Sequence, residues 1–580
     1  MKSCKKIFYD YIPVLTVAAI LPLLVYVHIY NYSSEQVAML SESIQLSDLF
    51  SYGKAVVFGV LTCWMVWSVV SDTLVQKRQN KETANRIFLL LIALGGWQVL
   101  SMFFAIDKTM AFFGGYGRFE GTYVLIGYLV LCYFTYKITR KHGKNDWVCV
   151  GLSISSIVMA IPGILQVFVA DPFLNEKVLR FLPPFATGME AQATLALPKA
   201  YMTLANPNTA SMYIAIVLPF LFLSSLMLKG WQQKLAIIAS LLDAMLLIFT
   251  GSRVGIVSLA LSLLIGGVLG RKTLKAHWKK VGVGLLLILI LAVGANFAMK
   301  LTTMSLGERM ASSKINGTVK EGLHCETKKD GIYLTKGDKQ YRLSFPADDD
   351  FYMTLKVYDG DGKDVTSSDF SFETGTFKDE AFKGITVEVV QVDEEDFLMV
   401  QEEQQWFFTH DTNGGYLLYV GNGCYDTIEN AKKITLPVSD SFASGRGYIW
   451  SRTLPLLTKY GLFGCGADNF VLAFPQTDYN GKRDYCKNYL TVIEKPHNGY
   501  LQLAIQNGIP ALVFILLFYI AYVRRMVKTK FKNPLMLGAF LGTVSFAFAM
   551  LFNDSNIMVT SLFFVFVGMT MGEAERKVIV

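Results

Sequence analysis

The residues best suited to chemistry in this chain gather between Ser444 and Pro510. Arg446 stands there between two glycines, and His497 precedes a short run of apolar residues at helical spacing. Arginine binds phosphate through two parallel hydrogen bonds and stays charged at any relevant pH. A neutral imidazole beside an anion can accept the proton of a hydroxyl nucleophile. This pair therefore indicates a phosphate-containing substrate, with His497 as the candidate general base.

Each candidate also has a plainer interpretation. Asn498 is placed to cap the following helix, so we expect His497 to face unpaired N–H groups that attract anions. A histidine that only anchors the chain at lipid headgroups would have the same spacing. Arg253, which follows a Thr-Gly-Ser turn, and Arg452 are further candidate phosphate ligands. Pairing of these arginines with lipid headgroups is the alternative.

Two earlier turns contain additional candidates. Arg118 lies in a glycine-rich turn beside Glu120, so a local ion pair is the alternative to a substrate contact. Asn208 lies in the turn Ala205-Asn206-Pro207-Asn208-Thr209, and we expect Asn208 to cap the helix that follows. Both turns precede long apolar segments, which places them near the ends of helices.

The composition predicts a membrane protein. Hydrophobic residues make up 52% of the chain and the mean hydropathy is +0.38. A helix needs about 20 largely apolar residues to span a bilayer. Twelve segments qualify, namely 11–30, 54–71, 86–105, 122–137, 147–169, 209–229, 233–249, 253–270, 281–299, 509–523, 534–552 and 557–572.

Lysine and arginine gather at the N-terminus and in alternate loops, which are 77–86, 137–144, 229–234, 271–280, 524–532 and 576–577. The intervening loops are poor in both residues. Basic loops lie on the cytoplasmic side of a membrane. The pattern therefore predicts that both termini are cytoplasmic and that the long loop 300–500 is extracytoplasmic.

Residues 301–440 differ in charge from the rest of the chain. They contain 14 Lys and Arg against 26 Asp and Glu, a net charge of −12, whereas the whole chain is +8 and the remainder is therefore +20. Short alternating runs separated by turns indicate a small antiparallel sandwich or barrel. We interpret this segment as an accessory domain.

These observations predict a polytopic α-helical membrane protein of about 12 transmembrane helices, with a β-rich extracytoplasmic domain inserted before the tenth. The expected parts are transmembrane helices 1–9 (residues 1–300), the β-rich insert (301–440), a catalytic loop with an interfacial helix (441–508) and helices 10–12 (509–580). No cysteine or histidine pattern has metal-ligand spacing, so no metal site is predicted. A Cys465–Cys486 disulfide and free thiols both remain open.

Six motifs resemble, in order and topological position, those of the O-antigen ligase/polymerase superfamily of bacterial membrane glycosyltransferases. They are GRFEGTY (117–123), LANPNTASMYIAIVLP (204–219), TGSRVGI (250–256), SGRGYIW (444–450), GLFGCGADNF (461–470) and PHNGYLQLAIQNGIPAL (496–512). The resemblance does not extend to residues 301–440.

The resemblance implies transfer of a glycan from an undecaprenyl-diphosphate carrier to an acceptor hydroxyl on the outer face of the bacterial cytoplasmic membrane. It implies an inverting, metal-independent enzyme without a cofactor. Arg253 and Arg446 match the pyrophosphate-binding arginines and His497 the essential histidine, whereas Arg118 and Asn208 match recurrent positions of less defined role. The implied partners are the lipid-linked glycan, membrane lipids and an acceptor glycan, wall polymer, lipid or protein, but no nucleic acid.

Two other classes of protein remain open. Many helices and a basic external mouth are also typical of a transporter or flippase for an anionic solute or lipid-linked sugar. A transporter should show internal repeats and charges within its helices, and Asp243 is an exception among nearly uncharged mid-helix positions. A sensor or wall-binding protein would use the β-rich insert as its receptor.

Overall fold

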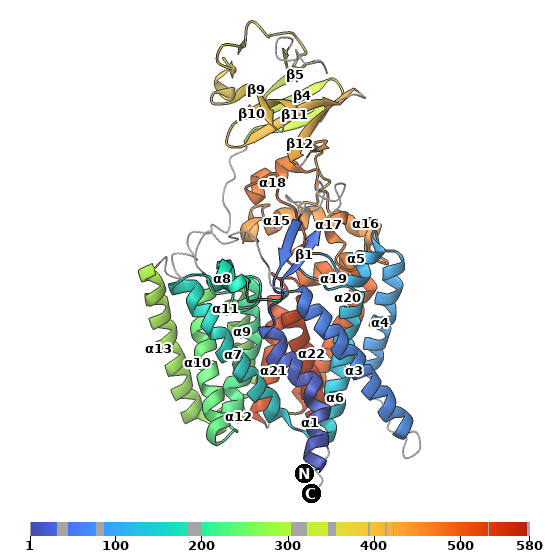
Figure 1. Cartoon of the computed structure of the whole chain (residues 1–580), viewed down its shortest axis with the longest axis vertical. Helices are drawn as coiled ribbons and strands as arrows, with labels where there is room; N and C mark the ends of the chain where they lie inside the picture. The colour runs from blue at the N-terminus through green and yellow to red at the C-terminus, as the bar shows by residue number, and fades with distance from the viewer. Residues whose placement is uncertain are drawn as a thin grey trace.

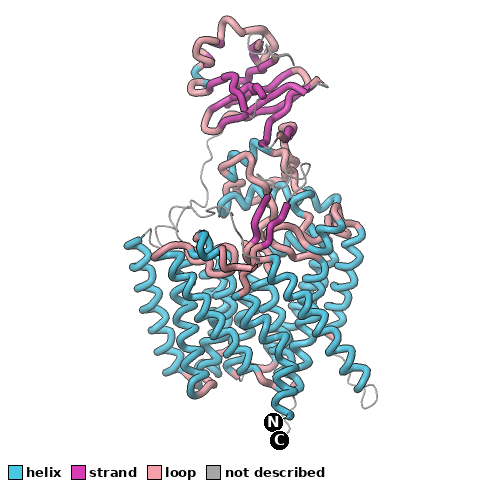
Figure 2. Tube along the Cα trace, in the orientation of Figure 1, coloured by secondary structure: helices cyan, strands magenta, loops and turns pink. Residues whose placement is uncertain are grey.

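The computed structural model describes residues 2–31, 45–76, 86–183, 199–302, 322–345, 355–392, 395–411, 414–421, 423–531 and 533–576. A helical bundle forms one part, and a β-sheet domain rises from one end of it (Figures 1 and 2). We call that end the upper face of the bundle. Parts of the predicted basic loops (77–85, 532 and 577) and of one predicted strand (351–354) lie outside the described residues.

Within the described chain, nine helices are long and apolar enough to cross a membrane. They comprise the segment Lys6–Leu23, which begins in α1 (Lys2–Leu15), and α3 (Tyr52–Gln76), α6 (Thr122–His142), α7 (Asn145–Phe168), α9 (Pro207–Ser225), α10 (Gly230–Thr250), α13 (Trp278–Thr302), α20 (Ile509–Lys528) and α22 (Ile557–Glu575). Shorter apolar helices are α4 (Phe88–Phe103), α11 (Arg253–Leu269) and α21 (Pro534–Ala549).

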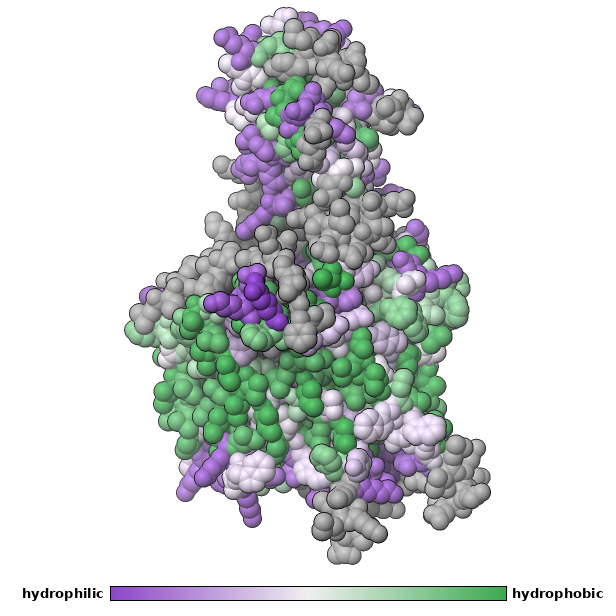
Figure 3. All heavy atoms as spheres, viewed as in Figure 1, coloured by the Kyte–Doolittle hydropathy of each residue, from purple (hydrophilic) through white to green (hydrophobic). Residues whose placement is uncertain are grey.

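These helices lie at the positions of the predicted apolar segments, and the number that cross a bilayer stays a prediction. Figure 3 shows a hydrophobic band across the visible face of the bundle, with hydrophilic residues above and below it. The chain is therefore a multi-pass membrane protein. Both ends of the chain lie at the lower face, opposite the sheets (Figure 1).

Close packing of α22 against α6 depends on two glycines one helical turn apart. A Cβ atom at Gly568 would lie 2.3 Å from the carbonyl oxygen of Cys132, and one at Gly572 would lie 2.6 Å from that of Tyr136. Small residues at this spacing allow helix backbones to approach closely in a membrane. The pair of helices therefore fixes the upper end of α22, where the loop Met550–Asn556 arrives from α21.

The domain above the bundle contains two antiparallel sheets. One has the order β3 (His324–Lys328), β4 (Gly331–Lys336), β5 (Lys339–Ser344) and β6 (Lys356–Asp359). The other has the order β13 (Cys424–Asp426), β12 (Gly415–Gly421), β11 (Gln405–Asp411), β10 (Glu395–Gln401), β9 (Thr386–Val392), β8 (Thr376–Phe377) and β7 (Phe370–Ser371). Their apolar faces share one core, so the predicted β-rich insert is confirmed.

The sheets are anchored to the segment that follows them in the chain. The side chain of Asn480, in α18 (Tyr479–Cys486), accepts a hydrogen bond from the backbone N–H of Cys325 at 3.0 Å and donates one to its carbonyl at 2.8 Å. The Tyr489 ring stacks on Trp406 with centroids 4.3 Å apart. The β domain and the loop 478–490 therefore form one structural unit.

Candidate functional site

An open cleft lies between the chain segments 441–449 and 484–497. Both main candidates from the sequence, Arg446 and His497, line this cleft. Lys487 and Lys495 add positive charge to its wall, and acidic side chains are present as well. The structure therefore brings together the basic group and the imidazole that the sequence placed in one segment.

Arg446 is positioned by an unusual turn. Ala443, Ser444 and Gly445 all have left-handed backbone angles, with φ of 51°, 63° and 86°. Regular helical geometry in α15 (Phe442–Thr453) therefore starts at Arg446. A residue other than glycine in the left-handed region costs about 1–2 kcal/mol, so the surrounding contacts must hold this turn in place.

The Arg446 guanidinium is held by two backbone carbonyls. Its Nη1 donates to Ala443 at 2.8 Å and its Nε to Phe552 at 3.2 Å. Burial lowers the pKa of Arg446 from its usual value, and the carboxylate of Asp554 opposes that shift. Among the ion pairs of the described residues, Arg446 has no carboxylate partner. Its charge is therefore available to an anion in the cleft.

His497 is oriented by a buried carboxylate. Its Nδ1 lies 3.0 Å from Oδ2 of Asp554, whose side chain is 7% exposed. Burial alone would raise the pKa of Asp554, but His497, Lys495 and Arg118 lower it to about 2. Since an ionised carboxylate only accepts hydrogen bonds, we assign the Nδ1 proton to His497. Nε2, for which the described residues provide no hydrogen-bond partner, is then the proton acceptor.

The N-terminus of α19 (Gly499–Asn507) differs from the sequence expectation in one respect. Asn498 is the N-cap, as predicted, and its side chain accepts from the second and third N–H groups of the helix at 3.1 and 3.0 Å. Its carbonyl accepts from the fourth, and the Gly499 N–H donates to Met550 at 2.8 Å. The expectation that His497 faces unpaired N–H groups is wrong, because the protein satisfies all of them.

Arg118 forms the predicted ion pair with Glu120 at 2.8 Å, and a second one with Asp468 at 3.3 Å. All three side chains are buried. Burial alone would lower the pKa of Arg118, but Asp468 and Glu120 raise it above its usual value. Ser555 accepts from Arg118 at 3.1 Å and donates to Glu120 at 2.6 Å. This cluster joins three separate loops at the upper face.

Arg452 is likewise balanced by acidic groups. It pairs with Asp440 and, at 3.3 Å, with Asp478, and its guanidinium lies 4.4 Å from the centre of the Tyr448 ring. The side chain is 7% exposed. These contacts connect α15 to the loops on either side of it and place Arg452 outside the set of residues that line the cleft.

Arg253 is the first residue of α11 and does not line the cleft either. The preceding residue, Ser252, donates a hydrogen bond to Oδ1 of Asn208 at 2.8 Å. Asn206, and not Asn208, caps α9, because its Oδ1 accepts from the N–H of Thr209 at 2.9 Å. The predicted cap at Asn208 is therefore wrong, and its side chain instead holds the turn before Arg253.

The loop between α21 and α22 links these groups, and sequence reasoning missed it. In this loop, Phe552 accepts a hydrogen bond from Arg446, and the Asn553 amide lies 3.8 Å from the sulfur of Met212 in α9. The next two residues, Asp554 and Ser555, contact His497 and Arg118 respectively. An available signal was the acidic residue in this short turn between two apolar segments, since charge at that position usually has a function.

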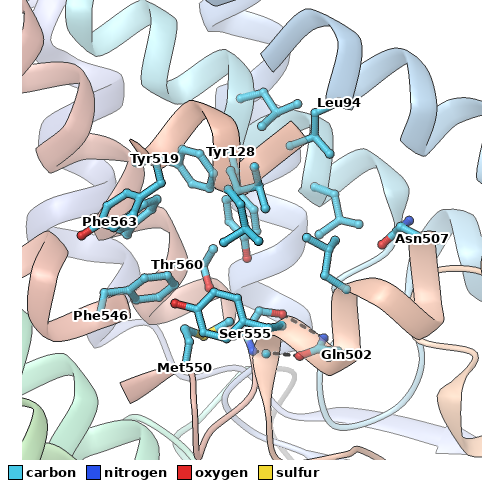
Figure 4. Close-up of a pocket in the computed structure, with 18 of the residues that line it drawn as sticks. Leu94, Tyr128, Gln502, Asn507, Tyr519, Phe546, Met550, Ser555, Thr560 and Phe563 are labelled. Carbon is cyan, nitrogen blue, oxygen red and sulfur yellow. Dashed lines mark hydrogen bonds between the residues drawn. The ribbon is translucent and has the colours of Figure 1, made fainter. Parts of the chain in front are cut away.

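A second, partly open cavity lies between α19 and the helices α4, α6, α20 and α22 (Figure 4). Its wall is mostly apolar and includes Leu94, Phe546 and Phe563. At one end, Gln502 donates to Ser555 Oγ at 2.9 Å and accepts from its N–H at 3.0 Å. The cavity therefore offers space for an apolar chain whose polar end would lie near the Arg118 cluster.

Cys465 and Cys486 are free thiols, so the disulfide that the sequence left open is not formed. Burial raises the pKa of Cys465, and it raises that of Cys486 to about 11. Both thiols are therefore protonated at neutral pH and are poor nucleophiles.

Comparison with known proteins gives one match. Residues 415–516 match the family described as O-Antigen ligase. The matched segment runs from β12 to the start of α20 and contains both Arg446 and His497. No curated protein and no solved structure matches the chain.

Removing the Arg118 charge tests the buried cluster. The Arg118→Met substitution leaves Glu120 and Asp468 buried without a positive partner, which we expect to cost about 3–5 kcal/mol of stability. Thermal unfolding of the purified protein in detergent should show a clearly lower melting temperature. Lys495→Met, at the partly exposed cleft wall, is the matched control and should change it little. An Arg118→Met protein as stable as the wild type would contradict this role.

Proposed function

Because the match at residues 415–516 supports the O-antigen ligase/polymerase superfamily as the family of this chain, we propose that the protein transfers a glycan from undecaprenyl diphosphate to an acceptor hydroxyl. The observation that carries the proposal is the pairing of His497 with Asp554 in the cleft that Arg446 lines. The family itself indicates a glycan-transfer role in polysaccharide assembly.

In the proposed reaction, Nε2 of His497 takes the proton of the acceptor hydroxyl as its oxygen attacks the anomeric carbon. The bond from that carbon to the carrier diphosphate breaks, and the diphosphate leaves with the electron pair. Attack opposite the leaving group inverts the anomeric configuration. Asp554 keeps the Nδ1 proton in place and stabilises the imidazolium that forms, as the carboxylate does in a catalytic triad.

Negative charge develops on the departing diphosphate. Arg446 is the best placed group to stabilise it, since its guanidinium is partly desolvated and has no carboxylate partner among the described residues. Lys495 lines the same cleft. Arg253 would approach the diphosphate from the end of α11. These fixed cations would supply the charge stabilisation that other transferases obtain from a metal ion.

The proposed location is the bacterial cytoplasmic membrane, with the upper face of the bundle outside the cell. The basic loops of the chain support this orientation, because Arg140 and Lys141 end α6 and Arg525 and Lys528 end α20. The apolar cavity beneath α19 would then accept the part of the prenyl chain nearest the diphosphate. Its polar end lies beside the loop that holds His497.

The His497→Ala substitution tests the proposed base. We expect transfer from purified, labelled undecaprenyl-diphosphate glycan to fall by at least about 10²-fold, because the substitution removes the proposed proton acceptor. The protein should still insert and fold, but with a lower melting temperature, because the buried Asp554 loses the partner that compensates its charge.

The matched control is His277→Ala, a histidine at the end of α12 (Arg271–Ala276) at the lower face (Figure 1). This variant should transfer at the wild-type rate. Unchanged transfer by His497→Ala would refute the proposed chemistry.

Filling the apolar cavity tests its proposed occupant. Leu516 lines the cavity from α20 and is 38% exposed, so a tryptophan there is tolerated sterically on its open side. Leu516→Trp should raise the KM for the lipid-linked donor about tenfold, equal to about 1.4 kcal/mol. The control Leu289→Trp alters a 60% exposed position on α13 and should leave the KM unchanged. Equal KM values for the two variants would exclude the cavity as the prenyl site.

A further inference from the structure

The outward face of the four-stranded sheet is polar and regularly ordered. Along each strand, every second residue points into the core instead, among them Cys325, Leu334, Leu343 and Val357. The outward residues are His324, Glu326, Lys328, Tyr333, Thr335, Gln340, Arg342, Ser344, Lys356 and Tyr358. This alternation follows from the pleat of a strand, in which successive side chains point to opposite faces.

One row of side chains crosses the whole sheet. The strand register places Glu326 beside Tyr333, Tyr333 beside Arg342, and Arg342 beside Tyr358. With neighbouring strands about 4.8 Å apart, the row is about 14 Å long. It combines two aromatic rings with a carboxylate and a guanidinium, and Asn430 donates to the Glu326 carboxylate at its β3 end at 3.0 Å.

The row is held in place by its neighbours. The guanidinium of Arg342 lies 4.2 Å from the centre of the Tyr358 ring and 2.8 Å from the carboxylate of Asp330. The ammonium group of Lys328 lies 4.2 Å from the centre of the Tyr333 ring. Such contacts reduce the conformational entropy that ordering these side chains around a ligand would cost.

The same face begins at the rim of the cleft. His324, the first residue of β3, has its Nε2 3.5 Å from Oδ2 of Asp484, and Asp484 lines the cleft. From the turn between β10 and β11, Gln404 donates to the carbonyl of Lys487 at 2.5 Å, and Lys487 also lines the cleft. A polymer chain that leaves the cleft on this side would meet β3 and then the row from Glu326 to Tyr358.

We propose that the outward face of the β3–β6 sheet binds an extended glycan chain that continues out of the cleft. The identity of the chain rests on the proposed function, since it would be the acceptor or the product of glycan transfer. Sugar hydroxyls donate and accept hydrogen bonds, and the row offers a carboxylate acceptor, a guanidinium donor and two tyrosine hydroxyls that do both. The edges of the tyrosine rings give apolar contact for the C–H faces of sugars.

Charge and composition favour a glycan over other occupants. Residues 301–440 carry a net charge of −12, which opposes binding to anionic lipid headgroups or other polyanions. The face also begins at the rim of the cleft through His324 and Asp484, where a glycan would leave the site. A neutral, hydroxyl-rich polymer does not meet the electrostatic obstacle.

Binding of purified glycan to the full chain in detergent tests the proposal. The probe is the surface polysaccharide of the cells from which the chain comes. It is released from its lipid carrier by mild acid and is then separated into single repeats and long chains. Tyr333→Ala and Arg342→Ala should each weaken binding of long chains about tenfold. Both residues are partly exposed, so melting temperatures should stay near the wild-type value. Binding of single repeats, which fill only the cleft, should not change.

The matched control is Tyr425→Ala on β13 of the other sheet, where the tyrosine hydroxyl donates to Glu395. It should bind long chains as the wild type does. The proposal would be overturned if Tyr333→Ala and Arg342→Ala bound long chains as tightly as the wild type. It would also be overturned if Tyr425→Ala weakened long-chain binding as much as these two variants do. The His497→Ala variant is read out by the transfer rate and the sheet variants by long-chain binding, so a failure of the proposed chemistry and a failure of this surface give different results.

Discussion

The geometry of the cleft depends on the contact between Asp554 and His497. A buried carboxylate is costly unless a positive or hydrogen-bonding partner compensates for the lost water. Asp554 obtains this compensation from the imidazole at 3.0 Å, so the partner that stabilises the carboxylate is also the group that it orients. Because Asp554 lies in the short loop between α21 and α22, the packing of these two helices decides where the imidazole stands. The same loop contacts Arg446 through Phe552, which links the position of the imidazole to that of the guanidinium.

The arginines near the upper face have different electrostatic surroundings, which separates structural from functional roles. Arg118 and Arg452 each have two carboxylate partners and connect loops that are far apart in sequence. In the part of the chain that the structure describes, Arg446 donates to two carbonyl groups and forms no ion pair, so its charge is less compensated than theirs. In the proposed reaction, this guanidinium would receive the charge of the diphosphate. The β domain adds to the same region, because its anchor on α18 supports the wall of the cleft opposite Arg446.

Local sequence patterns predicted the parts of this arrangement that depend on neighbours in the chain. The helices, the alternating strands, the cap at Asn498 and the Arg118–Glu120 pair all follow from spacing over a few residues. Asp554 was missed because its partner is 57 residues away and only the packing of the helices brings them together. The cap of α9 was assigned to Asn208 since both asparagines suit a cap, and only the backbone geometry at Asn206 decides between them. The free N–H groups expected at α19 were likewise satisfied by a tertiary contact with Met550.

The most direct measurement of the central claim is the single-turnover rate of glycan transfer by an Asp554→Asn protein at saturating lipid-linked donor. The amide of asparagine has nearly the same shape as the carboxylate but can donate a hydrogen bond to Nδ1 of His497. The imidazole proton would then lie on Nε2, and Nε2 could no longer accept a proton from the acceptor hydroxyl. The account predicts a fall of about 10²–10⁴-fold in this rate, comparable to the loss when the carboxylate of a catalytic triad is replaced in this way. A transfer rate equal to that of the wild type, from a protein that folds normally, would contradict it.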